Sequence, residues 1–433
     1  MGEWRQEVQQ RQARPRLIQA MIDAFSLPDL RRRLLFTLGV LIVFRFLAHI
    51  PVPGVDQAAL DKAFESNQLL GMLDLFSGGA MRNFSIVAMG VYPYITATIV
   101  MQLLQPVIPQ LRNLAMEGEA GRNKINTYTH WLAVPLAGLQ GYSQFVLLSR
   151  GGSIGQASTL DIAAIILSMM AGTMFLIWLG ELITERGIGN GVSIIIFAGI
   201  VAGLPNMFAK GELVWHEQIA GIIAFFVLWL AAVVMIVMFT EAARRIPVHY
   251  SRSVFRGRRM YRQSGSTHIP LRVNSAGMIP LIFAMSLVIL PATVASYFHG
   301  GAATFLQNWA SHWSYWLVYG LLVIAFSFFY TMVVFEQMNL AETLQKQGGF
   351  VPGIRPGQAT STYLSQVMNR LTWAGALFLA LVAVLPFIAQ KATGIQVVAL
   401  SSTGLLIMVG VALDTMKQLE AQLLMRRYEG FLK

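Results

Sequence analysis

The chain has 433 residues, of which 55% are hydrophobic and only 12% are charged, and its mean hydropathy is +0.57. Soluble proteins carry about twice that charged fraction, so the composition nearly excludes a soluble enzyme. A net charge of +11 would suggest a nucleic-acid partner for a soluble chain. For a membrane protein, the question is instead which side of the bilayer the basic residues face. The absence of cysteine excludes disulfides and cysteine-based metal chemistry.

Apolar windows predict ten membrane-spanning helices, each long enough to cross a hydrocarbon layer of ~30 Å at ~1.5 Å per residue. With a cytoplasmic N-terminus, 26 of the 32 basic residues fall in inside segments, which predicts that both termini are cytoplasmic. The sequence therefore predicts an all-α membrane protein. The predicted spans lie near residues 34–50, 84–105, 131–148, 160–179, 192–208, 218–240, 276–296, 313–335, 371–390 and 396–416.

Ten spans divide into two halves of five, and an odd number per half inverts the second half relative to the first. On this division the N-terminal half covers residues 1–206, an external hinge covers 207–217 and the C-terminal half covers 218–433. Two long cytoplasmic loops of the second half are predicted at 241–272 and 336–370. The inverted repeat follows from parity alone, because the two halves show no strong similarity in sequence.

One apolar segment is too short to be a span. The stretch from Leu69 to Met81 is broken by Gly78 and Gly79 and immediately precedes the second predicted span. It is typical of a half-helix that enters the membrane from the outside and turns back. An interfacial helix on the outer surface is the alternative interpretation.

The spans contain few of the ionisable residues that mark ion or proton pathways. Arg45, near the outer end of the first span, is expected to extend its side chain outward. Four acidic residues sit near the cytoplasmic ends of spans: Glu181, Glu241, Glu336 and Asp414. This distribution argues against a proton- or sodium-coupled transporter, and an inverted-repeat solute transporter is kept as the alternative function.

Sequence signatures of catalysis and cofactor binding are missing. His216 and Glu217 begin a zincin-like motif, but Ala220 stands where the second histidine would be. Residues 187–191 (GIGNG) depart from the dinucleotide-binding fingerprint, and the chain has no Walker A motif. We therefore predict that the chain is not an enzyme and holds no metal or cofactor.

Several long motifs occur in order along the chain. They are SIVAMGVYPYITATIVMQ (85–102), GEAGRNKI (118–125), IWLGELITERGIGNGVSII (177–195), RRIPVHYSRS (244–253), LRVNSAGMIP (271–280) and GGFVPGIRPG (348–357). Together they resemble the SecY family, the pore-forming subunits of bacterial protein translocases, and the resemblance covers essentially the whole chain. In one departure, Glu336 and Gln337 follow Phe335 where the family commonly has Asn-Pro, so the end of the eighth helix is left open.

The resemblance implies ten helices in two inverted five-helix halves around a central hourglass pore, with a lateral gate between the second and seventh spans. It implies a pore ring of Val91, Ile95, Val192, Ile196, Ile282 and Ile407. It implies a plug that includes Leu69, Leu70, Gly71, Met72, Leu73, Asp74, Leu75, Phe76, Ser77, Gly78 and Gly79. The implied lateral-gate residues are Pro93, Thr96, Asn274 and Gly277. The implied residues for binding SecA or the ribosome are Arg244, Arg245, Arg252, Arg256, Arg258, Arg259 and Arg355.

The residue types of the implied ring suit a channel for polypeptides. Val91 and Ile95 are four residues apart, as are Val192 and Ile196, so each pair stacks on one helix face. A collar of branched aliphatic side chains forms no specific hydrogen bonds, so it parts around any sequence and blocks ions by dewetting when narrow. Each residue taken alone is more typical of ordinary packing or lipid contact, and only the family resemblance assigns it to a ring.

The segment from Arg244 to Arg272 contains eight arginines, a composition suited to ribosomal RNA phosphates or to acidic grooves of a motor protein. Membrane orientation alone is the other explanation for a basic cytoplasmic loop. The resemblance implies the small subunits SecE and SecG, the SecA motor ATPase, the ribosome, signal sequences, nascent chains and membrane lipid as partners. We predict a channel of the bacterial plasma membrane that passes unfolded secretory chains and releases transmembrane segments sideways into lipid.

Overall fold

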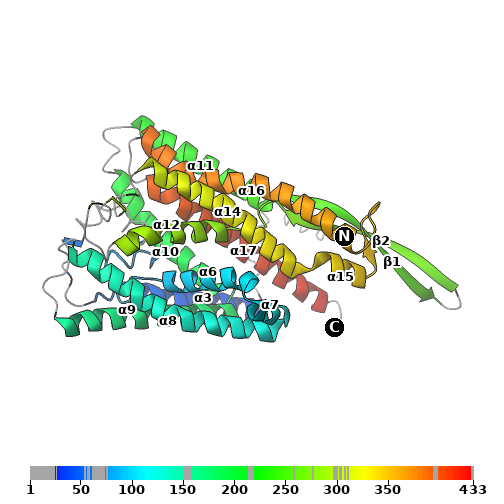
Figure 1. Ribbon diagram of the computed structural model, residues 1–433, viewed down its shortest axis with the longest axis horizontal. Helices are drawn as coiled ribbons and strands as arrows, with labels where there is room; N and C mark the ends of the chain where they lie inside the picture. Colours follow the sequence, from blue (N-terminus) through cyan, green and yellow to red (C-terminus); the bar gives the residue numbers. More distant parts are fainter. Residues whose placement is uncertain are drawn as a thin grey trace, which may run out of the picture. The chain divides into compact units, whose positions relative to one another are not determined.

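The structure is a computed structural model. It describes residues 25, 27–52, 55, 59–60, 74, 77–150, 158–212, 219–256, 259–275, 277–295, 301, 305–306, 309, 312–393 and 398–430. Most of these residues are helical (Figure 1). The helices are α3 (Pro28–Leu47), α6 (Tyr92–Val107), α7 (Pro109–Met116), α8 (Glu119–Arg150), α9 (Thr159–Arg186), α10 (Gly191–Glu212), α11 (Ile219–Glu241), α12 (Ile279–Ala295), α14 (Trp313–Met338), α15 (Leu340–Lys346), α16 (Gln358–Thr393) and α17 (Val398–Gly430). The strands are β1 (Ala243–Arg256), β2 (Arg259–Arg272) and β3 (Gly349–Phe350).

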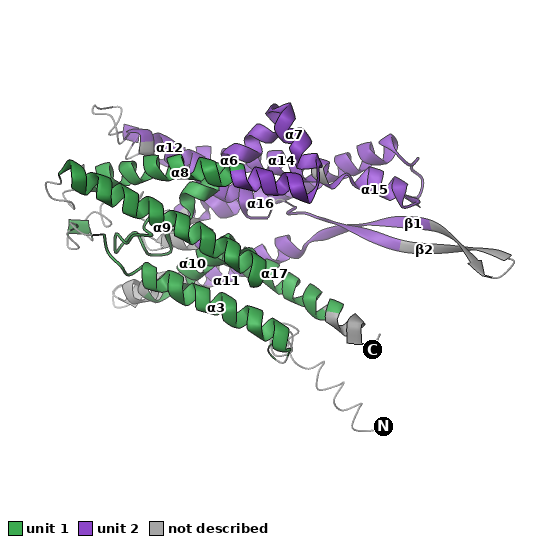
Figure 2. Ribbon diagram, turned by 90° about the horizontal axis from the view of Figure 1, so that it is seen from below, with its two compact units in different colours: residues 1–98, 128–213, 407–433 green, residues 99–127, 214–406 purple. Residues whose placement is uncertain are grey.

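The chain forms two compact units, shown in different colours in Figure 2. Unit 1 comprises Met1–Thr98, Tyr128–Leu213 and Ile407–Lys433, and unit 2 comprises Ile99–Thr127 and Val214–Leu406. Each unit therefore combines segments that are distant in the sequence. The division at 207–217 into two inverted halves stays a prediction; helix α10 continues to Glu212, and residues 213–218 lie outside the described part of the chain.

Each of the ten predicted spans coincides over more than half of its length with a helix of the structure. Within the described residues, three helical segments are long and apolar enough to cross a membrane: Thr159–Arg186, Trp313–Lys346 and Gln358–Leu385. The shorter apolar helical segments are Gly191–Pro205, Trp229–Glu241 and Ile279–Ala292. The mostly helical membrane architecture is confirmed, whereas the layout of ten spans in two halves stays a prediction.

The second predicted span, 84–105, is wrong in its first part, because α6 begins only at Tyr92. The preceding residues form consecutive turns, in which Phe84 has a φ of 40°. Their backbone groups bond partly within these turns and partly to the chain that follows α3. The Val52 amide donates to the Phe84 carbonyl across 2.9 Å, and the Ile86 amide donates to the Ile50 carbonyl across 3.1 Å. With 16 residues, α6 is only about 24 Å long.

The prediction of an all-α fold is wrong for the loop at 241–272, which forms an antiparallel hairpin. Strands β1 and β2 pair from Ala243 with Arg272 to Arg256 with Arg259, and β3 pairs with β1 to complete a sheet in the order β2-β1-β3. Ile246 and Val248 are buried while Pro247 between them is exposed, which is the period-two pattern of a half-buried strand. The prediction of a loop rested on its charge and not on this alternation.

The hairpin base packs on the other predicted cytoplasmic loop within unit 2. Its strands contribute Ile246, Val248 and Leu271 to a buried cluster, which continues through α15 and the start of α16 with Leu344, Val351, Leu364, Val367 and Met368. A Cβ on Gly349 of β3 would lie 2.9 Å from the Tyr250 ring, so β3 lies directly against that side chain. The loops at 241–272 and 336–370 thus fold into one body, called here the basic module (Figure 2).

The end of the eighth predicted span is also settled by the structure. Helix α14 continues through Glu336 to Met338, and Asn339 ends it in the left-handed conformation with a φ of 42°. Asparagine tolerates this conformation better than most residues, so it replaces a glycine cap. The Glu336 carboxylate pairs with Arg112 of α7, also in unit 2. Glu336, which departs from the family pattern, therefore joins α14 to α7 through an ion pair.

Candidate functional site

The pore-ring candidates of the second span lie at the start of α6, in unit 1. Val91 immediately precedes the helix and Ile95 lies in its first turn, and both side chains are buried. The Ile95 amide donates to the Val91 carbonyl across 3.1 Å, which is the bond of a helical turn. The two residues are therefore one turn apart, as their spacing predicts, even though the preceding residues are not helical.

The other ring candidates lie on three helices. Val192 and Ile196 belong to the beginning of α10, and Ile407 belongs to α17, all in unit 1. Ile196 and Ile407 are buried, at 3% and 1% exposed. Ile282 lies on α12 in unit 2 and is half-buried. The assembly of all six into one ring is part of the proposal made below.

The glycine motif at 187–191 forms the turn that starts α10. The Gly187 amide donates to the Ile183 carbonyl across 2.7 Å, and the Gly191 amide donates to the Thr184 hydroxyl across 2.9 Å. Gly189 has a φ of 83°, a conformation that favours glycine. A Cβ on Gly191 would lie 1.8 Å from the Gly180 carbonyl oxygen. The motif thus allows α9 and α10 to approach closely.

The same turn is joined to α3 and α17. Ile188 is buried together with Leu30 of α3 and Leu419 of α17. The Ile188 amide also donates to the Thr37 hydroxyl of α3 across 3.3 Å. This contact fixes the start of α10 against α17 within unit 1, and both helices carry ring candidates.

Replacing Gly191 with alanine is expected to lower the stability of the chain. The added methyl group would overlap the Gly180 carbonyl, and overpacking of this kind costs about 1–3 kcal/mol. We expect a clear fall in the temperature at which the detergent-solubilised protein loses its monodisperse size-exclusion peak. Gly203→Ala is the matched control on the same helix, because a Cβ at Gly203 meets nothing within 4 Å. Equal peaks for the two variants would contradict the packing of this turn.

The plug candidates fall only partly within the described residues. Leu69, Leu70, Gly71, Met72, Leu73, Leu75 and Phe76 lie outside them. Asp74 and Ser77 are helical, and the chain then turns at Gly78 and Gly79, which have φ values of 68° and 81°. Residues 77–82, called here the plug turn, are followed by the turns that lead into α6.

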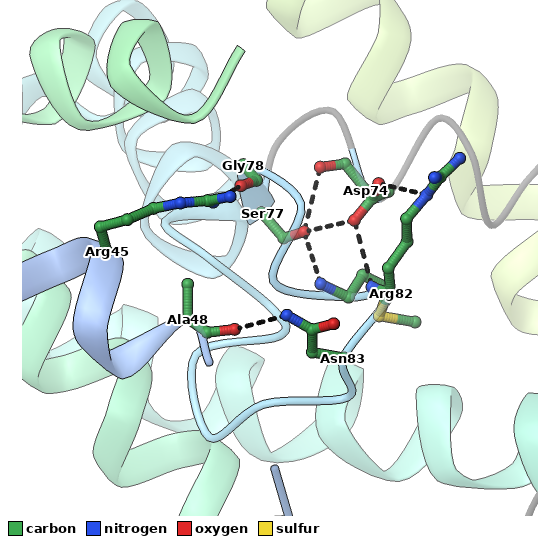
Figure 3. A network of polar contacts seen from close by, with 8 residues as sticks. Arg45, Ala48, Asp74, Ser77, Gly78, Arg82 and Asn83 are labelled. Carbon is green, nitrogen blue, oxygen red and sulfur yellow. Dashed lines mark hydrogen bonds and ion pairs between the residues drawn. The ribbon is translucent and has the colours of Figure 1, made fainter. Parts of the chain in front are cut away.

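A network of polar contacts closes the plug turn on Asp74 (Figure 3). The Ser77 hydroxyl donates to the Asp74 carbonyl across 3.0 Å and accepts from the Met81 amide across 3.0 Å. The Asp74 carboxylate accepts from the Arg82 amide across 3.3 Å and lies 3.4 Å from Arg82 Nε. The pKa of Asp74 is raised, because the effect of burial exceeds the lowering by the Arg82 charge and the hydrogen bonds. The carboxylate thus has its partners inside the turn.

Sequence reasoning missed two residues that hold the plug turn. Arg45 does not simply extend outward, because it is half-buried and its Nη1 donates to the Gly78 carbonyl across 3.1 Å. Gly199 of α10 lies against Gly78, where a Cβ would be 2.3 Å from the Gly78 Cα. An arginine near a span end and a glycine within an apolar run are both common. Only the folded chain shows what they contact.

The lateral-gate candidates occupy two elements in different units. Pro93 and Thr96 lie on α6 in unit 1, where the Thr96 hydroxyl accepts from Gln140 Nε2 of α8 across 3.3 Å. Asn274 and Gly277 lie in unit 2, in the turn before α12 and not within it. Gly277 has a φ of 63°, which a helix does not accommodate. The predicted seventh span therefore starts too early.

The first turn of α6 is also held by an aromatic contact. The Tyr94 ring stacks on the His130 ring of α8, with their centroids 5.4 Å apart. His130 Nε2 in turn lies 3.1 Å from the Glu181 carboxylate of α9. Within unit 1, the stacking and the Thr96 hydrogen bond join the part of α6 that carries the lateral-gate candidates to α8, and His130 joins α8 to α9.

The arginine candidates for partner binding belong to the basic module. Arg244 and Arg245 are exposed on β1, and Arg355 is exposed in the turn before α16. Arg252, Arg256 and Arg259 lie further along the hairpin, where the backbone alone is described. Arg258 lies outside the described residues.

The turn that carries Arg355 has a fixed backbone. Gly353 and Gly357 flank it with φ values of 80° and 98°. The buried Thr360 side chain donates its hydroxyl to the Arg355 carbonyl across 2.9 Å, while Val351 is buried in the cluster of the basic module. The guanidinium is therefore presented to solvent from a well-anchored turn.

Comparison with known proteins decides the family. The SecY family model matches residues 85–416. The chain belongs to the SecY family. Its relatives include the protein translocase subunits SecY of Halalkalibacterium halodurans, 46% identical over 96% of this chain and 100% of the relative, and of Streptomyces lividans, 42% identical over the same shares. SecY of Thermotoga maritima is 42% identical over 96% of this chain and 98% of the relative. The family resemblance and the predicted role in protein translocation are confirmed.

Solved SecY and Sec61 channels share the fold. A protein-conducting channel matches with a TM-score of 0.59 and 18% identity, over 90% of this chain and 92% of the other. A SecY protein whose plug domain stabilises the closed translocation channel matches with a TM-score of 0.61 and 19% identity over the same shares. Sec61 from a canine ribosome-channel complex matches with a TM-score of 0.56 and 17% identity over the same shares.

Proposed function

We propose that this SecY-family chain is the passive pore of a bacterial plasma-membrane translocase, with both termini in the cytoplasm. It passes unfolded secretory polypeptides through an hourglass pore between two inverted halves and releases transmembrane segments sideways into lipid. The full-length match to translocase subunits at 42–46% identity carries this proposal. Those relatives do not favour the alternative of a solute transporter.

The site residues are assigned roles on this basis. Val91, Ile95, Val192, Ile196, Ile282 and Ile407 form the pore ring, which parts around the cargo. Pro93 and Thr96 on one side, and Asn274 and Gly277 on the other, form the lateral gate. The segment 69–81 is the plug, in keeping with the plug domain of the similar SecY structure. The chain performs no covalent chemistry and needs no cofactor.

Partners are assigned by the exposed arginines of the basic module. Arginine pairs well with phosphate and carboxylate groups, so this face suits ribosomal RNA or an acidic surface of the SecA motor. A similar structure comes from a ribosome-channel complex, which supports the ribosome as one partner. SecE and SecG are the proposed small membrane subunits. Energy for transport comes from the SecA motor or the ribosome.

A crosslinking experiment tests the proposed pore. The chain has no native cysteine, so one cysteine at Ile282 is a unique reactive site. A secretory polypeptide with a single cysteine, stalled midway through membrane vesicles, is expected to form a disulfide with it. Leu287→Cys is the matched control on the same helix, because Leu287 is exposed while Ile282 is half-buried. Absence of a crosslink at Ile282, in vesicles that translocate, would show that the pore lies elsewhere.

A further inference from the structure

The plug turn rests on α10 through two glycines of unit 1. A Cβ on Gly78 would lie 2.5 Å from the Gly199 Cα, and a Cβ on Gly199 would lie 2.3 Å from the Gly78 Cα. Neither position therefore accepts any side chain without displacing the other backbone. The φ of 68° at Gly78 separately favours glycine. Gly78 and Gly199 are called here the glycine seat.

Arg45 holds the plug turn on this seat from α3. Its Nη1 donates to the Gly78 carbonyl across 3.1 Å, and Gly79 lies beside the same guanidinium, where a Cβ would be 3.8 Å away. The preceding residue, Phe44, is 1% exposed and lies under Gly78. A hydrogen bond from a charged donor such as a guanidinium is stronger than one between neutral groups.

Hydrogen bonds between Asp74 and the plug turn, and within the turn, brace its backbone. Asp74 accepts from the Ser77 hydroxyl and from the Arg82 amide, and the Ser77 hydroxyl accepts from the Met81 amide (Figure 3). Beyond its C-terminal end, Asn83 Nδ2 donates to the Ala48 carbonyl across 3.2 Å. Arg45 and the glycine seat thus hold the N-terminal end of the plug turn, and the Asn83 contact holds its C-terminal end.

We propose that Arg45 is a positioning residue that keeps the plug turn on the glycine seat in the closed channel, and that loss of this contact accompanies displacement of the plug. This inference rests on the proposed function, because it takes the segment 69–81 as the plug. A single arginine hydrogen bond suits the role, since it fixes one carbonyl firmly and is replaced by water when the turn leaves.

The first test measures exposure of the plug turn without any transport. Ala80 is fully buried within the turn, so a cysteine there is expected to react slowly with a water-soluble maleimide in the purified, reconstituted chain. With Arg45→Gln, the labelling rate is expected to rise roughly tenfold, the change expected for loss of one hydrogen bond to a charged group. Arg45→Lys, which retains the charge without the fork of donors, is expected to give an intermediate rate.

Two further variants separate the contact from general effects. Arg31→Gln removes the same charge from an exposed position on α3 and is expected to leave the labelling rate unchanged. Gly199→Ala leaves Arg45 intact but fills the seat, so it is expected to raise the rate as Arg45→Gln does. An unchanged rate in Arg45→Gln, or an equal rise in Arg31→Gln, overturns the positioning role whether or not the chain transports protein.

The second test asks whether the contact controls the closed state. Vesicles with Arg45→Gln are expected to leak ions faster at rest and to accept cargo with a weakened signal sequence, again by roughly tenfold. Faster labelling with an unchanged leak and unchanged cargo selection overturns the link to plug displacement. Failure of the crosslink at Ile282 overturns the proposed pore instead, so the two failures are distinguishable.

Discussion

Replacing Arg355 with glutamate is expected to abolish motor-driven translocation while leaving the chain folded and inserted. The side chain is exposed, so the reversal of charge disturbs no packing and changes stability by about 0.5 kcal/mol or less. Against an acidic or phosphate surface, a like charge in place of a complementary one costs several kcal/mol, which is a loss of more than about a hundredfold in binding. ATP-driven import of a secretory protein into vesicles, with chain levels checked by immunoblot, measures the result.

Two companion variants make the Arg355 result specific. Lys346→Glu reverses a charge on α15 in the same module, at a side chain that is 74% exposed and paired with Glu342, and it is expected to retain most transport. Thr360→Val keeps the arginine but removes the hydroxyl that binds its carbonyl, so a partial loss is expected. An equal loss of transport in Lys346→Glu would show that the overall charge of the face matters and that Arg355 makes no specific contact with the partner.

The positions of most helices follow from the sequence because the bilayer sets the length of an apolar run. The spans predicted at 160–179 and 313–335 fall within α9 and α14 for this reason. The turns before α6 were not foreseen, because they are fixed in part by backbone bonds to residues 50–52, which are distant in the sequence. An apolar composition is equally compatible with a helix and with turns buried by other segments, and only tertiary contacts decide.

The basic hairpin was missed for a different reason. Its arginines indicated a solvated loop, yet Ile246 and Val248 alternate with the exposed Pro247 and face the cluster that includes Val351. Their burial depends on α16, which lies about a hundred residues further along the chain. The sequence therefore located the arginines that we propose for partner binding, while the scaffold that presents them came from pairing between two loops.

The residues of the candidate site likewise fall into those that the sequence indicated and those that only the folded chain revealed. The family resemblance pointed to Val91, Ile196 and Gly78, because a resemblance transfers positions. Arg45 and Gly199 were not assigned to the site, since their role lies in one hydrogen bond and one contact between backbones. Such contacts leave no periodic pattern, so no reading of hydrophobicity or charge would single these residues out.

Replacing Ile407 with asparagine is expected to loosen the closed channel and admit cargo with weak signal sequences. The side chain is 1% exposed on α17, so an amide placed there is buried. A buried polar group without a partner costs about 1–3 kcal/mol. If opening hydrates the ring, this cost falls on the closed state alone, and the equilibrium shifts toward the open state by roughly 5- to 150-fold. Export of a reporter with a defective signal sequence measures the shift.

The distinction between a ring residue and an ordinary core residue is what the Ile407 variant must establish. Ile183→Asn places the same amide at a fully buried position of α9, where opening of a pore offers it no water. That variant is expected to lower thermal stability without relaxing cargo selection, and Ile407→Val is expected to change neither. Relaxed selection in Ile407→Asn together with nearly normal stability would assign the energetic cost to the closed ring. A loss of stability with normal selection would place Ile407 in the core, and the ring would have to be built from other residues.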